Sequence, residues 1–385
     1  MTFVILRSDH QQHRIKGNLA TGGVCLHVDL MRRETRQGLQ SCIRGLLIFV
    51  LGALQVVFGQ APNAEKPVPI FTGSAGFFTN VNAGETQLVP IVSPVLLVPL
   101  GERWLIESRG EFEGEFEKPQ GGSSFGGKVH KEVDYLQVDY IANPYVTVTA
   151  GRFLTPFGIY NERLYPIWIR SLQPTPLIFP IGSGSSDGFM LRGGLPANAR
   201  INLNYAIYFS ALSTVNKFES DRMVGGRIGF FLPGSRIEMG ASLQQLLQEQ
   251  RQSAAGFHFA WQPAKTPLTL RSEYAWSGEK GSGYWIEAVY RLSQIPRWQQ
   301  VLRHAEVVGR TQQFFAGSIA EEDEAAAYGL SEVNAKQADF GANYYLRDGV
   351  KATASYGRRF TPEGNFNLWT VGIAYRFAFP LGKGQ

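Results

Sequence analysis

The chain has 385 residues, of which 44% are apolar, 12% are aromatic and only 18% are charged, with 43 glycines and 20 prolines. Ordinary globular domains carry about 25% charged residues, so this protein's surface is poor in charge for its size. The first 59 residues hold seven of the 37 basic and three of the 32 acidic residues, so the rest of the chain has a formal charge of +1 instead of +5. This balance gives no indication of a nucleic-acid partner. A soluble β-sandwich or propeller is the alternative class that shares the composition.

The N-terminal part of the chain has the pattern of an export signal. Several arginines between residues 32 and 44 precede the apolar run LLIFVLGALQVVFG at 46–59, and a basic stretch, about 7–15 apolar residues and a small-residue cut site form the secretory pattern. An uncleaved membrane anchor is the alternative. Cys25 and Cys42 both precede a cut at Gln60, so the exported protein is expected to have no disulfide and no thiolate metal site. The expected segments are an unused upstream extension at 1–30, a signal peptide at 31–59 and a short periplasmic extension at 60–69.

Beyond residue 59 the chain has no apolar run of 18 residues, the length that a membrane-spanning helix requires. Instead, segments of about ten residues alternate apolar and polar side chains, which is the signature of transmembrane β-strands. The last segment is the clearest, because Trp369, Val371 and Ile373 share one face while Thr370 and Gly372 share the other. Sixteen strands are expected, at 70–79, 87–97, 104–117, 128–142, 145–155, 187–194, 200–211, 222–231, 236–248, 253–261, 267–277, 283–292, 299–314, 336–347, 350–360 and 366–379.

The connections between these segments alternate in length. Tight turns such as Asn143-Pro144 and Pro233-Gly234-Ser235 alternate with longer links, notably 156–186, 212–221 and 315–335. Short periplasmic turns and longer outer loops alternate in this way in outer-membrane barrels. The predicted fold is therefore all-β, a closed antiparallel transmembrane β-barrel of about 16 strands at 70–385, with both termini periplasmic. A barrel of this size leaves an aqueous channel.

The link at 156–186 is too apolar to extend into water, because it combines five prolines with Trp168, Leu177 and Phe179. Connections longer than about 12–15 residues are usually functional or disordered, and this composition argues against disorder. We expect the link to fold into the barrel mouth and constrict the channel, with Arg163 and Arg170 facing the solute path. Packing outward on a neighbouring subunit is the alternative.

Strand parity predicts which side chains line the pore. Charged residues belong on the inward face, because Arg or Lys on the lipid face costs about 2–4 kcal/mol at the bilayer midplane. The predicted lining contains both acidic and basic side chains, which indicates weak ion selectivity. Aromatic pairs near segment ends, such as Tyr284/Trp285, are expected in interfacial girdles. The predicted pore-lining residues are Glu107, Arg109, Glu111, Glu113, Gln137, Asp139, Asn202, Asn204, Arg271, Glu273, Glu287, His304, Glu306, Lys351 and Arg376.

The stretch AGRFLTPFGIYNERLYP at 150–166, in which a glycine-basic-aromatic step runs into a Thr-Pro-Phe-Gly turn, resembles porins of the phosphate-selective O/P type. The preceding hairpin, YLQVDYIANPYVTVTAG, resembles them as well. The resemblance implies an outer-membrane porin, with anions such as phosphate among its solutes. The sequence departs from that pattern in two places: six residues follow Phe379, where such barrels end on an aromatic residue, and the inward face from Glu107 to Glu115 is mainly acidic.

The predicted function is passive diffusion of small hydrophilic solutes through an outer-membrane porin of a Gram-negative-type bacterium. No catalytic residue, metal or cofactor is expected, since His130, His258 and His304 have no partner at metal-ligand spacing and no serine has a nucleophile context. The expected partners are outer-membrane lipid, the solutes, the barrel assembly machinery and, as one option, further copies of the chain in a homotrimer. The alternatives are an outer-membrane barrel enzyme and a plugged structural or adhesive surface barrel.

Overall fold

The computed structural model describes the barrel-forming part of the chain. Residues 1–67 lie outside the described residues, and with them the predicted upstream extension, signal peptide and most of the N-terminal extension. The described residues are 68–82, 84–119, 122, 124–182, 184–198, 200–211, 213–215, 218–248, 251–296, 298–318, 331–347 and 349–381.

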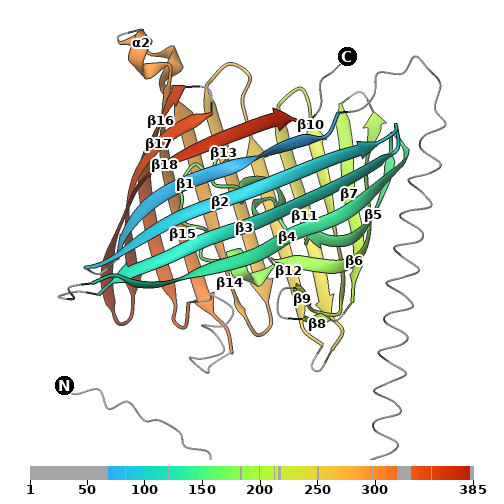
Figure 1. The fold of residues 1–385 in the computed structure, drawn as a ribbon, viewed down its shortest axis with the longest axis horizontal. Coiled ribbons are helices and arrows are strands. Elements are labelled where there is room, and N and C mark those ends of the chain that lie inside the picture. The colour runs from blue at the N-terminus through green and yellow to red at the C-terminus, as the bar shows by residue number, and fades with distance from the viewer. Residues whose placement is uncertain are drawn as a thin grey trace, which may run out of the picture. The chain divides into compact units, whose positions relative to one another are not determined.

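Sixteen strands form a closed antiparallel barrel in which each barrel strand pairs with the next, and β1 closes the ring on β18 (Figure 1). The predicted fold class is confirmed, and each predicted segment corresponds to one strand. Among the described residues, no helix is long and apolar enough to cross a membrane. The barrel strands are β1 (Ile70–Asn82), β2 (Glu85–Leu100), β3 (Trp104–Lys118), β4 (Gly126–Asn143), β5 (Val146–Leu154), β6 (Ser185–Asn198), β7 (Ile201–Ser210), β10 (Met223–Leu232), β11 (Ile237–Leu246), β12 (Ser253–Trp261), β13 (Leu268–Ser277), β14 (Gly281–Arg291), β15 (Ala305–Ala316), β16 (Ala335–Arg347), β17 (Val350–Thr361) and β18 (Gly364–Pro380).

Two connections hold structure that alternation did not predict. The link at 212–221 contains a hairpin of β8 (Ser213–Val215) and β9 (Phe218–Ser220), which form a separate two-stranded sheet. The predicted strand at 299–314 starts later, because Gln299–Leu302 forms helix α2 and β15 begins at Ala305. Strand-like alternation over the first residues of that segment was therefore misleading.

Strand β2 contains two prolines within its paired length. Pro90 and Pro94 both belong to a continuous register with β1, but the register with β3 skips them. Proline has no N–H to donate to a ladder, so one of the two neighbouring ladders loses bonds. Ser93, between the prolines, donates its hydroxyl to the carboxylate of Glu111 at 3.0 Å.

The first and last strands start and end at the same rim of the barrel, because Ile70 pairs with Pro380. Connections at this rim are short, apart from 292–304, which contains η3 (Leu292–Gln294) and α2 (Figure 1). The strand ends that flank the longest links, 155–184 and 317–334, lie at the opposite rim. In outer-membrane barrels the rim with short turns faces the periplasm.

The outer face of the barrel is apolar. On β16, Phe340 and Leu346 are 66% and 52% exposed, whereas the alternate side chains Asp339 and Asn343 are buried inside. On β7, Ile207 is exposed in the same way. Apolar surface of this extent is rare on soluble monomers and marks contact with a membrane or a partner. The outer face of the barrel is therefore suited to lipid.

An arginine placed halfway along a strand on this face is expected to destabilise the barrel. Phe340 lies near the middle of β16, so Phe340→Arg should lower the free energy of unfolding by about 2–4 kcal/mol, the cost of Arg at the bilayer midplane. The matched variant Leu346→Arg, near the end of the same strand, should cost about 0–1 kcal/mol. Urea unfolding in lipid vesicles measures both. Equal costs for the two variants would contradict a membrane-embedded outer face.

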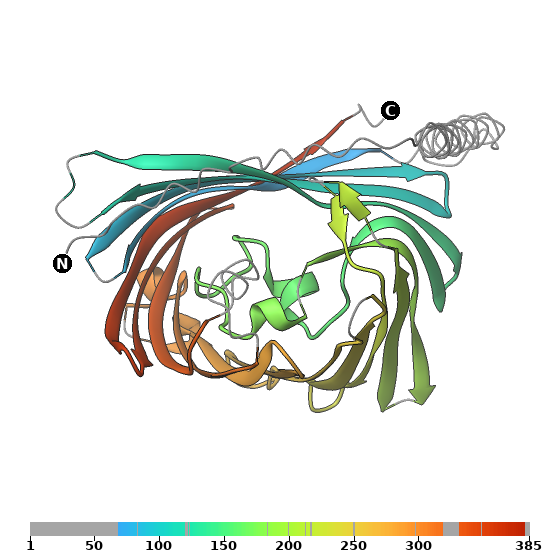
Figure 2. The ribbon, with the colours of Figure 1, turned by 90° about the horizontal axis from the view of Figure 1, so that it is seen from below.

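The long link between β5 and β6 lies inside the barrel. Figure 2 shows residues 155–184 within the ring of strands, with η1 (Tyr160–Leu164), a π-helical turn, and η2 (Phe179–Ile181), a 3₁₀ turn. Hydrogen bonds to Ser242 of β11 and Gln312 of β15 place it against the inner wall. We call residues 155–184 the lumen loop.

Candidate functional site

A buried carboxylate of the barrel wall holds the start of the lumen loop. Glu273 on β13 accepts hydrogen bonds from the backbone N–H groups of Ile159 and Tyr160, and its second oxygen accepts one from the indole N–H of Trp285 at 2.9 Å. The first N–H groups of a helical turn have no partner within the turn, so a carboxylate here satisfies them and meets the positive end of the turn's dipole.

Two ion pairs fix the η1 segment to β10 and β11. Arg163 donates to both oxygens of Glu238 at 2.7 and 2.8 Å, and Arg227 pairs with Glu162. Arg227 also donates to the backbone carbonyl of Gly158 at 2.8 Å. Both contacts of Arg163 come from its Nη1 atom, and hydrogen bonds between ionised groups are stronger than those between neutral groups. The predicted constriction residue Arg163 therefore lies in the lumen but is engaged by the wall.

The middle of the loop wraps around a buried lysine. Lys351 on β17 is 0% exposed, and its ammonium group donates to the carbonyls of Trp168 at 2.8 Å, Arg170 at 2.7 Å and Ile167 at 3.4 Å. Hydrogen bonds to charged groups contribute about 1.5–3 kcal/mol each. Lys351 therefore fixes the turn at 167–170 against the wall through backbone carbonyls, and no described carboxylate forms an ion pair with it.

The return half of the loop is bound by β15 and β16. Arg310 donates to the carbonyl of Pro174 at 2.8 Å, Gln312 accepts from the N–H of Leu177 at 2.9 Å, and Asn343 donates to the carbonyl of Ser171 at 2.8 Å. Arg310 and Gln312 also share the buried carboxylate of Asp339. These side chains satisfy backbone groups that leave water when the loop enters the lumen.

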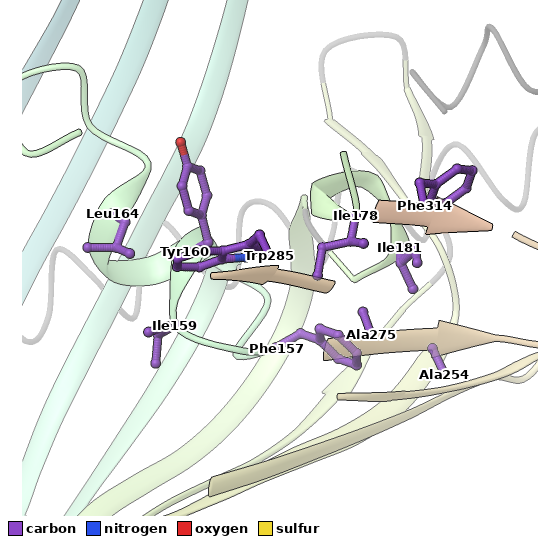
Figure 3. Packing of buried hydrophobic residues seen from close by; sticks show 10 residues of the cluster. All are labelled: Phe157, Ile159, Tyr160, Leu164, Ile178, Ile181, Ala254, Ala275, Trp285 and Phe314. Atoms are coloured by element: carbon purple, nitrogen blue, oxygen red, sulfur yellow. The ribbon is translucent and has the colours of Figure 1, made fainter. Parts of the chain in front are cut away.

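Apolar contacts add to these anchors. Figure 3 shows Phe157, Ile178 and Ile181 of the loop packed with Trp285 and Phe314 of the wall. Elsewhere in the lumen Ile167 packs against Phe78, Val89 and Ile91, and Leu172 packs against Val289 and Val308. Burying a side chain of this size contributes about 1.5–3 kcal/mol. The loop is thus packed as a fixed part of the barrel.

Tyr165 joins the loop to the acidic face of β3. Its hydroxyl donates to Glu111 at 3.0 Å, and the guanidinium groups of Arg170 and Arg109 lie 4.5 and 5.2 Å from its ring centre. Burial, and then the charge of Glu111, raise the pKa of the Tyr165 hydroxyl, so this group stays protonated and able to donate. Arg170, the second predicted constriction residue, also donates to the carbonyls of Tyr165 and Gln173.

The lumen loop leaves one side of the barrel interior unfilled. None of the described hydrogen bonds joins residues 156–182 to β4, β5, β6 or β7, although the loop contacts most of the other strands. A cavity of about 150 Å³ lies on that side, between Glu162 of the loop and the wall. We call it the side hollow. It is lined by Glu107, Tyr135, Gln137, Phe153, Leu154, Glu162, Met190 and Arg192.

The structure places nearly all of the predicted pore-lining residues on the inner face, but the lumen loop or buried ion pairs cover many of them. Only Glu107 and Gln137 line the side hollow. His304 lies in the turn before β15, with its ring 6.3 Å from that of Tyr344, at the rim. Inward positions are occupied by Glu107, Arg109, Glu111, Glu113, Gln137, Asp139, Asn202, Asn204, Arg271, Glu273, Glu287, Glu306, Lys351 and Arg376.

The predicted pore lining left out several inward residues. Arg192, Arg227 and Arg310 lie inside, although their strands alternate clearly enough to have shown it. Trp285, expected in an interfacial girdle, is 1% exposed and packs in the lumen. The girdle assignment was wrong because it depended on position near a segment end, whereas the face of the strand decides where an aromatic side chain lies.

The described residues contain no group of three or more His, Cys, Asp and Glu side chains arranged to hold a metal ion. Two described histidines lie beside single carboxylates: the exposed His130 has its Nε2 2.9 Å from Glu115, and the buried His258 has its Nε2 3.8 Å from Glu238. Glu238 is itself occupied by Arg163. The pair of Glu238 and Arg163 supports the loop.

No protein-family model matches the chain, and no curated protein matches it either. Solved structures do match in fold. The high-pH structure of OprB from Pseudomonas putida has a TM-score of 0.56 at 8% identity, covering 81% of this chain and 94% of that one. OmpF of Salmonella typhi, in complex with daunomycin, has a TM-score of 0.53 at 12% identity, covering 80% and 97%. An anion-selective porin from Comamonas acidovorans has a TM-score of 0.51 at 13% identity, covering 81% and 99%. The chain therefore has the fold of the outer-membrane porins.

Proposed function

We propose that the protein is an outer-membrane porin through which small hydrophilic solutes diffuse passively, with its narrowest passage at the side hollow. The observation that carries this proposal is the position of the lumen loop, which is bound to the β10–β18 side and leaves the β4–β7 side unfilled. The fold, the apolar outer face and the polar inner face support it, since sixteen-stranded barrels with these features enclose aqueous channels.

The charges at the side hollow support a weakly selective channel. Glu107, Glu162 and Arg192 line it, and Arg192 is partly neutralised by Asp139 at 3.2 Å. Selectivity follows the lining charges at the narrowest point, and here the excess is a single negative charge, because Glu162 pairs with Arg227 and Arg192 with Asp139. A phosphate-selective channel would need clustered basic side chains at that point, so we propose general solutes in preference to phosphate.

Single-channel conductance in planar bilayers tests the proposal against its alternatives. A steady open-channel current is the expected result, and a plugged structural or adhesive barrel would pass none. An outer-membrane enzyme would release products from lipid or peptide substrates, which the purified protein should leave intact. Absence of current at every voltage would overturn the channel.

Thiol modification locates the passage. In a background with Cys25 and Cys42 replaced by serine, Leu154→Cys should react with a charged methanethiosulfonate reagent and lose roughly half or more of its conductance, because the added group fills the side hollow. Val289→Cys, buried under Leu172, is the matched control and should stay unmodified. Reaction at the control with no effect at Leu154 would place the passage on the other side of the loop.

A further inference from the structure

The side hollow has a negative pole, Glu107, that forms no described ion pair. No described Lys, Arg or His nitrogen forms an ion pair with Glu107, and its described hydrogen bond comes from Gln137 at 3.4 Å, which is long for an N–H···O contact. Glu162, the other carboxylate of the hollow, is by contrast paired with Arg227. The oxygens of Glu107 are therefore available to an ammonium group.

The hollow also has a positive pole. Arg192 uses one nitrogen to contact Asp139 at 3.2 Å, and its side chain is 37% exposed. A guanidinium has five N–H donors in a planar fork, so the remaining donors are available to a carboxylate, which this geometry suits. The charge of Arg192 acts on Glu107 through space, but no described ion pair of 4.0 Å or less joins the two side chains, so each keeps hydrogen-bonding capacity for a solute.

We infer that the side hollow binds small zwitterions that carry one ammonium and one carboxylate group, such as free α-amino acids with short side chains. This inference rests on the proposed channel function and narrows its solute class. A simple cation is attracted by Glu107 but repelled by Arg192, and a simple anion is attracted by Arg192 but repelled by Glu107. A zwitterion can place its ammonium group at Glu107 and its carboxylate group at Arg192. A neutral solute gains neither contact, so the difference in affinity sets the preference.

The shape of the hollow agrees with this class. A cavity of about 150 Å³ holds several water molecules or one solute of comparable size. Phe153, Leu154 and Met190 give it an apolar part beside the two charges. A short side chain on the solute can lie there while the charged groups reach Glu107 and Arg192.

Liposome swelling with L-serine and glycerol, which are close in size, tests the inference. The wild-type protein should admit serine faster than glycerol at low concentration, and the serine rate should saturate. Glu107→Gln and Arg192→Gln should each lower the ratio of serine to glycerol rates about three- to fivefold, as expected for loss of one partly exposed charge contact. Glu117→Gln, an exposed carboxylate further along β3, is the matched control and should keep the ratio.

A second measurement on the wild-type protein does not depend on how the variants fold. Serine should reduce the single-channel current in a concentration-dependent way, and the same concentrations of glycerol should not. If glycerol swells the liposomes, but serine shows neither saturation nor preference and does not reduce the current, the zwitterion site is refuted while the channel stands. If neither solute enters and no current flows, the channel itself is refuted.

Discussion

Deleting residues 166–180 from the lumen loop should raise the single-channel conductance roughly twofold or more, because barrels of this size enclose a wide aqueous channel when nothing fills them. The segment removed includes the turn around Lys351 and the part bound by Arg310 and Asn343. Its loss opens the β14–β18 side of the lumen, which the loop fills in the native protein. Planar-bilayer recordings of the refolded variant measure the change.

A matched variant separates the bulk of the loop from its anchoring. Replacing 166–180 with the same number of glycine and serine residues keeps the length but removes Ile167 and Leu172, which pack on the wall. This variant should also conduct more, with added current noise from an unanchored segment. Wild-type conductance in both variants would show that residues 166–180 do not restrict the passage.

The strands of this protein could be predicted from its sequence because each strand is a local pattern. Alternation of apolar and polar residues, as in Trp369 to Ile373, identifies a strand with one face on lipid. The lengths of the connections then indicate which end of each strand lies at the periplasmic rim. Antiparallel pairing of consecutive strands needs no further information. The count of sixteen followed from these two signals alone.

The path of the lumen loop could not be predicted in the same way. Its anchors join residues far apart in the chain, such as Ile159 with Glu273 and Trp168 with Lys351. Parity placed Glu273 and Lys351 inside but could not show that the loop covers them and that they serve as its anchors. For the same reason, the sequence assigned Arg163 and Arg170 to the solute path, while the structure pairs Arg163 with the wall and stacks Arg170 on Tyr165.

Local irregularities also limited the assignment of inward residues. A bulge in β4 opposite Arg109 and Gly110 shifts the register, and Asp134 turns inward to pair with Arg109 at 2.9 Å. Alternation counted across a bulge reverses the two faces. The difficulty with Arg192 is different. Its strand alternates regularly, but the role proposed for Arg192 depends on the side hollow, whose position follows from the path of the loop.

Glu273→Ala should release the first half of the lumen loop while leaving the barrel closed. The substitution removes the acceptor for the N–H groups of Ile159 and Tyr160 and for the indole of Trp285. Each buried donor left without a partner costs about 1–3 kcal/mol, which is comparable to what one apolar anchor of the loop contributes. We therefore expect a noisier open-channel current and new protease cleavage between residues 157 and 165.

The control is Glu287→Ala on the neighbouring strand. Glu287 is also a buried inward carboxylate, but its described partner is Arg271 of the wall at 3.5 Å, not the loop. Its removal disturbs the charge of the lumen to a similar degree and should leave residues 157–165 resistant to protease. Cleavage in both variants would mean that lumen charge, and not the contact with Ile159 and Tyr160, holds the loop. Resistance in both would mean that the apolar packing of Phe157 and Ile178 is sufficient to hold it.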